Sequence, residues 1–238
     1  MIVNRQEITV NPIQEYSLVK MNYGFKLPYY TAFFNAFLVL FTISAQSGYA
    51  QNNKNAGFDL ASCTFTETIQ SIDKFSGIKV STKISAEKTL AGYERSESNS
   101  SELLNYNHSD LSGKFNQLDN KVIFHYKEKD GILGMYELRI YSAAQNNSLV
   151  KVLQTKIGVP DLERVVKDYG NGSDFKQTIW VKKDIIYFLL QELNKHDVKV
   201  SNLAVFKKNN TDFYTLLGTK GYAINPKVLI EEVLNKRK

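Results

Sequence analysis

The sequence predicts an α+β domain in which an antiparallel sheet, covered on one face, is flanked by helices. Three observations predict this class. Several short segments after residue 120 alternate apolar and polar residues, as half-buried strands do. Two segments, 58–75 and 226–234, repeat apolar residues at helical steps of three and four. Turn residues separate the strand segments at short intervals, and no internal repeat or second domain boundary is evident, so we expect residues 58–238 to form one domain.

The first fifty residues have the pattern of a secretory signal. The apolar run 32–45 carries no charge and is fourteen residues long. As a helix it would cover about 21 Å, which is short of the roughly 30 Å hydrocarbon core of a bilayer. The small residues Gly48 and Ala50 follow it and suit a signal peptidase. We therefore expect cleavage near Ala50, a mature chain that begins at Gln51, and a secreted or periplasmic protein.

The start of the signal is less regular than its end. From Met21 the segment before the apolar run is short and carries Lys26, whereas from Met1 it is long and includes two glutamates. We therefore expect residues 21–50 to be the signal peptide and 1–20 an upstream extension. Two alternatives remain: an uncleaved segment that anchors the protein in the membrane, and a core helix of a cytoplasmic protein.

The composition limits which partners, covalent modifications and cellular compartment we expect for this protein. The 238-residue chain has 30 basic and 24 acidic residues, and the excess is scattered, so no nucleic-acid partner is expected. Cys63 is the single cysteine, which excludes an intramolecular disulfide. Its Leu-Ala-Ser-Cys context resembles a lipobox but lies too far beyond the apolar run for lipidation. Five Asn-x-Ser/Thr sequons would be glycan acceptors on a eukaryotic secretory route, whereas in a bacterial envelope, the setting we favour, they would be silent.

The first part of the mature chain is expected to change from helix to strand to loop. Residues 51–57 are polar and are expected to be flexible. A helix over 58–75 is expected to end at Gly77 and to carry Cys63 as an inert apolar residue. A strand follows over 78–84. The segment 94–113 is rich in Ser, Asn and Glu and is expected to be a long polar loop.

The second part is expected to be rich in strands. A hairpin over 120–142 turns at 129–131, and its partners are expected in the segments that follow. The expected strands are 148–157, 175–182, 203–206 and 213–217. The expected helices are 160–169, 184–195 and a last one that begins at Pro226 behind the cap Asn225. Residues 184–195 also fit a strand, paired through a turn at Lys183 and Asp184.

No catalytic, cofactor or metal motif stands out, and we assign no site residue. His108, His125 and His196 form none of the spacings of a zinc site. His125 has the same parity as Ile123 in an alternating segment, which favours a place on a sheet face over a role as a base. His108, Ser109 and Asp110 are the residue types of a hydrolytic triad, but triads are assembled through space rather than from neighbours.

One further loop has ligand-like chemistry. Residues 168–174 place aspartates and glycines close together, as a calcium loop does, but their spacing is not that of an EF-hand. A turn between a helix and a strand accounts for the same residues.

These observations favour an exported, non-enzymatic protein that binds a protein partner or an envelope component through its sheet face or its polar loop. Membrane contact is expected only through an uncleaved N-terminal segment. The alternative is an exported hydrolase with a dispersed active site, for which His125 or His108 would serve. An inhibitor or immunity-like protein would share the features of the first class.

Overall fold

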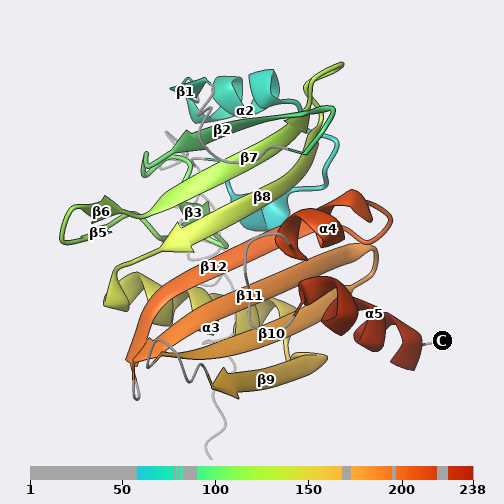
Figure 1. Cartoon of the computed structure of the whole chain (residues 1–238). Coiled ribbons are helices and arrows are strands. Elements are labelled where there is room, and N and C mark those ends of the chain that lie inside the picture. The colour runs from blue at the N-terminus through green and yellow to red at the C-terminus, as the bar shows by residue number, and fades with distance from the viewer. Residues whose placement is uncertain are drawn as a thin grey trace, which may run out of the picture. The chain divides into compact units, whose positions relative to one another are not determined.

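An eight-stranded antiparallel sheet organises the chain, and Figure 1 shows it as one twisted layer. The computed structural model describes residues 58–77, 79, 81–82, 90–167, 173–194, 197–218 and 225–237. The expected extension, signal peptide and flexible segment (1–20, 21–50 and 51–57) lie outside these residues. Across the sheet the strands are β1 (Ser81–Thr82), β2 (Tyr93–Ser98), β7 (Lys121–Lys127), β8 (Leu133–Ile140), β12 (Asp197–Lys207), β11 (Ile185–Asn194), β10 (Asp174–Lys182) and β9 (Leu162–Lys167).

Helices cover both faces of this sheet. The 3-10 helix η1 (Leu60–Ser62) and the helices α2 (Ile69–Ser76) and α3 (Ala143–Ile157) pack on one face. Helices α4 (Asp212–Gly218) and α5 (Pro226–Lys236) pack on the other (Figure 1). The prediction of an α+β fold with an antiparallel sheet and flanking helices is confirmed, but the expectation of a single covered face is wrong. Both faces are covered because the central strands are apolar at odd and even positions alike: Phe188 belongs to one core and Leu189 to the other.

The segment expected to be a polar loop is largely ordered. It contains β2 and the hairpin of β3 (Asn105–Tyr106) and β4 (Ser109–Asp110), and a second hairpin of β5 (Lys114–Phe115) and β6 (Leu118–Asp119) follows. Its few apolar residues explain the difference, because each is fully buried in the core beside η1: Leu103, Leu104, Tyr106 and Leu111.

The expected helix over 58–75 is correct only in its second half. The Thr68 side chain accepts a hydrogen bond from the Ser71 amide, and the Ser71 hydroxyl caps Thr68 in return, so α2 starts there. Before it, the Glu67 carboxylate accepts hydrogen bonds from the backbone of Thr64 and Thr66. These local bonds compete with helical ones, and Cys63 consequently lies outside α2. The helix ends at Gly77, as predicted.

Four other element types were predicted incorrectly. The segment 148–157 is part of α3 rather than a strand, and 213–217 lies in α4. The segment 160–169 contains the edge strand β9 rather than a helix. The preferred helix over 184–195 is also wrong, since β11 is a strand that turns through Lys183 and Asp184, as in the alternative.

The remaining elements follow the prediction. The β7–β8 hairpin turns at Gly131 with φ +68, β10 and β12 are strands, and Asn225 caps α5 with Pro226 in its first turn. Of the strand expected over 78–84, residues 81–82 form β1, residue 79 is described but lies outside any strand, and the rest lies outside the described residues. None of the helices in the described part of the chain is long and apolar enough to cross a membrane.

Candidate functional site

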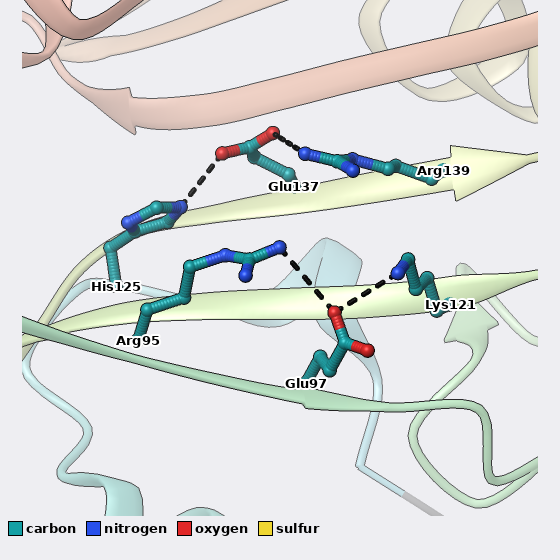
Figure 2. Close-up of polar contacts among 6 residues, drawn as sticks. All are labelled: Arg95, Glu97, Lys121, His125, Glu137 and Arg139. Carbon is teal, nitrogen blue, oxygen red and sulfur yellow. Dashed lines mark hydrogen bonds and ion pairs between the residues drawn. The ribbon is translucent and has the colours of Figure 1, made fainter. Parts of the chain in front are cut away.

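Charged side chains form a ladder across one face of β2, β7 and β8, on the side of the sheet that faces α4 (Figure 2). They alternate along each strand with residues of the opposite core, because side chains two residues apart share a face. We call this group the charged ladder, and its members are Arg95, Glu97, Lys121, His125, Glu137 and Arg139.

Two carboxylates hold the charged ladder together. Glu97 Oε2 lies 3.0 Å from Lys121 Nζ and 3.4 Å from Arg95 Nη2. Glu137 Oε1 lies 2.7 Å from His125 Nε2, and its second oxygen lies 3.9 Å from Arg139 Nη2. Each carboxylate therefore joins two basic side chains, as Figure 2 shows.

The strand register explains why both carboxylates are needed. Arg95 pairs directly with His125, and Lys121 pairs directly with Arg139, so basic residues stand opposite one another across the sheet. Such pairs repel when both are charged, and a carboxylate placed diagonally between them offsets the repulsion. Exposure rises along the ladder, from 2% for the His125 side chain to 25% for that of Lys121.

A β-bulge lies beside His125. Tyr126 pairs with Leu133 and His125 with Met135, which leaves Gly134 without a partner in the ladder of hydrogen bonds. A Cβ atom at Gly134 would lie 2.5 Å from Tyr93 and 3.0 Å from Phe213, so only glycine lets these rings approach. The Phe213 ring packs edge-on against His125 with centroids 6.0 Å apart.

His125 and Glu137 resemble a base oriented by a carboxylate, but burial limits what they can do. The His125 side chain is 2% exposed and the Glu137 side chain 4% exposed, so a substrate has no direct approach to either. Within the described residues, no serine, threonine or cysteine side chain hydrogen-bonds to His125. The prediction that His125 fills a sheet face agrees with this placement.

The other sequence candidates are not assembled into a site. His108 lies exposed at the turn of the β3–β4 hairpin, and the Asp110 carboxylate accepts a hydrogen bond from the Ser112 amide rather than orienting His108. His196 and most of the loop 168–174 lie outside the described residues. Among those described, no group of three His, Cys, Asp or Glu residues could hold a metal ion. Burial, with Glu67 and Asp59 nearby, raises the pKa of the Cys63 thiol well above its usual value, which makes it a poor nucleophile.

Sequence reasoning missed a polar hollow that opens at the exposed end of the charged ladder. It measures about 320 Å³, and Tyr141 and Leu118 provide its aromatic and apolar surface. We call it the polar hollow, and its polar lining consists of Glu97, Ser98, Asn99, Gln117, Asp119 and Lys121. Two side-chain pairs already order this lining: Asn99 donates to Asp119 at 3.2 Å, and Lys121 pairs with Glu97.

Asn120 fixes the wall of the polar hollow between Asp119 and Lys121. Its buried amide nitrogen donates to Leu111 O at 2.9 Å and to Ser142 Oγ at 2.7 Å. Its amide oxygen accepts from the Tyr141 backbone at 2.8 Å. The β5–β6 hairpin, the start of β7 and the start of α3 are thus joined at one residue.

Comparisons with known proteins add little to this geometry. No protein family model matches the chain, and no curated protein matches it. Among solved structures, the chain is similar to the crystal structure of YjgB, a DUF4309 family protein from Bacillus subtilis, with 12% sequence identity and a TM-score of 0.27. The similarity covers 58% of this chain and 77% of that one. The class supported by the structure itself is an α+β sheet protein with a polar hollow at one end of its sheet.

Proposed function

We propose that this protein is an exported, non-enzymatic binding protein whose polar hollow holds a neutral, hydroxyl-rich ligand of the saccharide class. The composition of the lining carries the proposal. Carboxylates, amides and a lysine offer both acceptors and donors to hydroxyl groups, and Tyr141 offers an aromatic surface. The volume of about 320 Å³ lies at the lower end of the range for small-molecule sites.

The charges of the lining favour a neutral ligand. Lys121 is paired with Glu97, and Asp119 accepts a hydrogen bond from Asn99. The hollow therefore presents polar atoms whose positions are already set, without a cluster of one sign. A site ordered before binding loses less entropy when it takes up its ligand.

Enzymatic activity has weaker support. The alternative of a hydrolase requires His125 or His108 to act on a substrate. The first is buried, and the second lies in an exposed turn without an orienting partner among the residues that the structure describes. Neither histidine lines the polar hollow. The expectation that the protein is exported rests on the signal pattern in its sequence.

The experiment is a binding titration with maltose, glucose and N-acetylglucosamine, followed by amide chemical shifts and calorimetry. At least one sugar should shift resonances of residues 97–99 and 117–121. Gln117→Ala should weaken its binding about fivefold, since one neutral hydrogen bond contributes about 1 kcal/mol. Gln154→Ala is the matched control, because Gln154 is exposed on α3 away from the hollow. Absence of shifts with all three sugars, or equal losses in both variants, would contradict the proposal.

A further inference from the structure

An apolar groove adjoins the polar hollow on the other side of the β5–β6 hairpin. It measures about 640 Å³ and lies between this hairpin, the first turn of α3 and the start of β12. We call it the apolar groove, and its apolar lining consists of Phe115, Leu118, Tyr141, Ala143, Val198 and Val200. Asn147 and Lys199 add polar groups to it.

Two side chains line both the polar hollow and the apolar groove. Leu118 and Tyr141 line the polar hollow and the apolar groove, so the two spaces meet at one shared wall. Phe115 and Leu118 are directly opposed in the β5–β6 pair and are 55% and 53% exposed. Two large apolar side chains that stand together in water favour an apolar occupant.

The charge at the apolar groove is already balanced. A β-bulge leaves Lys199 out of the pairing between β11 and β12, and its Nζ lies 3.3 Å from Glu192 Oε1. The lining therefore adds no unbalanced cation, and an acidic group gains little there. An uncharged hydrocarbon segment fits the lining best.

We infer that the polar hollow and the apolar groove form one bipartite site for an amphiphile. The hydroxyl-rich head of the ligand lies in the polar hollow, and its hydrocarbon chain lies in the apolar groove. This inference rests on the proposed function, since it assigns the head to the same polar lining. The head accounts for the hydrogen-bonding lining, and the chain accounts for Phe115, which lines only the apolar groove and which a free sugar in the polar hollow would leave exposed.

The test compares each free sugar with its dodecyl glycoside. Maltose, glucose and N-acetylglucosamine are titrated beside their β-dodecyl glycosides, all below the critical micelle concentration, with dodecylphosphocholine as a chain that lacks a sugar. Removal of one methylene group from water strengthens binding roughly fourfold. For a sugar that binds, the glycoside should bind on the order of 100-fold more tightly, as burial of roughly three or four methylene groups would give.

A pair of variants locates the chain. Ala143→Phe fills the apolar groove from its α3 wall, whereas Ala144→Phe places the same ring on the next exposed residue of α3, outside the lining. Ala143→Phe should bring the affinity for the glycoside close to that for the free sugar and leave free-sugar binding unchanged. Ala144→Phe should change neither.

The outcomes separate this inference from the proposed function. If a free sugar binds and its glycoside binds no more tightly, the bipartite site is refuted while sugar binding stands. If no free sugar binds and dodecylphosphocholine binds as tightly as the glycosides, the apolar groove acts alone, and both proposals are wrong. Selective loss of the glycoside gain in Ala143→Phe supports the bipartite site.

Discussion

The hydrogen-bonded pair of His125 and Glu137 is as buried as the aliphatic residues around it. Glu137 is 3% exposed and His125 2% exposed, while Ile123, between the two basic positions of β7, is fully buried. A charged group at this depth is tolerated because it has a close partner, here at 2.7 Å. Removal of one partner therefore lowers the free energy of unfolding by more than the intact pair contributes to it.

Glu137→Gln should consequently lower the free energy of unfolding by about 3 kcal/mol, because it leaves His125 and Arg139 without their carboxylate. Urea denaturation measures the change. Glu163→Gln is the control: its ion pair with Lys176 at 2.9 Å is largely exposed, and its loss should cost less than about 1 kcal/mol. If both variants lose the same free energy of unfolding, burial does not determine how much such a pair stabilises the fold.

Two buried tyrosines make stability depend on alkaline pH. Burial, above all, raises the pKa of Tyr106 and of Tyr136 far above the ordinary value; Tyr187 adds to the effect on Tyr106, and Tyr106 adds to the effect on Tyr136. The unfolded chain ionises both near pH 10, whereas the folded chain keeps both protonated. Unfolding thus releases protons above about pH 10, and stability should fall there by about 1.4 kcal/mol per pH unit for each tyrosine, with no such slope below that pH.

Tyr106→Phe removes one of these two groups. Its free energy of unfolding, measured by urea titration from pH 9 upward, should fall less steeply above about pH 10 than that of the unchanged protein, by up to about 1.4 kcal/mol per pH unit. Parallel slopes would mean that Tyr106 already ionises in the folded state.

Among the secondary-structure elements, α3 and β11 show where sequence patterns mislead. The alternation of Leu149, Val150, Lys151 and Val152 suggests a strand, but the buried positions of α3 are 146, 149, 153 and 157, which have helical spacing. The pattern is visible only when the helix is extended back beyond the expected strand 148–157 to include Asn146. In β11 the run 185–190 is apolar throughout because both faces are covered, and a continuous apolar run does not distinguish a strand from a buried helix.

The junction of the β5–β6 hairpin with α3 depends on one amide. Asn120→Leu leaves the Leu111 carbonyl and the Tyr141 and Ser142 amides without the Asn120 bonds, so it should cost about 3 kcal/mol or more. It should also weaken sugar binding, because Asp119 and Lys121 flank it. Asn209→Leu, at an exposed turn, should change stability by less than about 0.5 kcal/mol. If the amide hydrogen-exchange rates of the β5–β6 hairpin are unchanged in Asn120→Leu, Asn120 does not hold the hairpin to α3.

For the molecule as a whole, the sequence predicted the class of fold but not the site. Parity placed His125 on a sheet face, yet its partner Glu137 follows only from the register of the β7–β8 hairpin with its bulge. The polar hollow joins 97–99 with 117–121 and Tyr141, and that meeting depends on which strands are neighbours. Burial also excludes one of the five sequons: Asn146, which Asn147 and Ser148 follow, is 1% exposed within α3, so the folded chain does not present it to a glycosyltransferase.

The expected destination of the chain is the last prediction, and it concerns the whole protein. Expressed from Met21 in a bacterial host, the chain should appear outside the cytoplasm with Gln51 as its first residue, because the apolar run 32–45 is too short for a stable span and the small Ala50 suits the peptidase.

N-terminal sequencing of each cell fraction makes the measurement. Ala50→Phe should block cleavage and leave a longer, membrane-bound product, while Gln51→Phe, just beyond the expected cut, should be processed as before. A full-length chain in the cytoplasm would remove export from the proposed function, and the binding experiments on the polar hollow would then apply to an intracellular ligand.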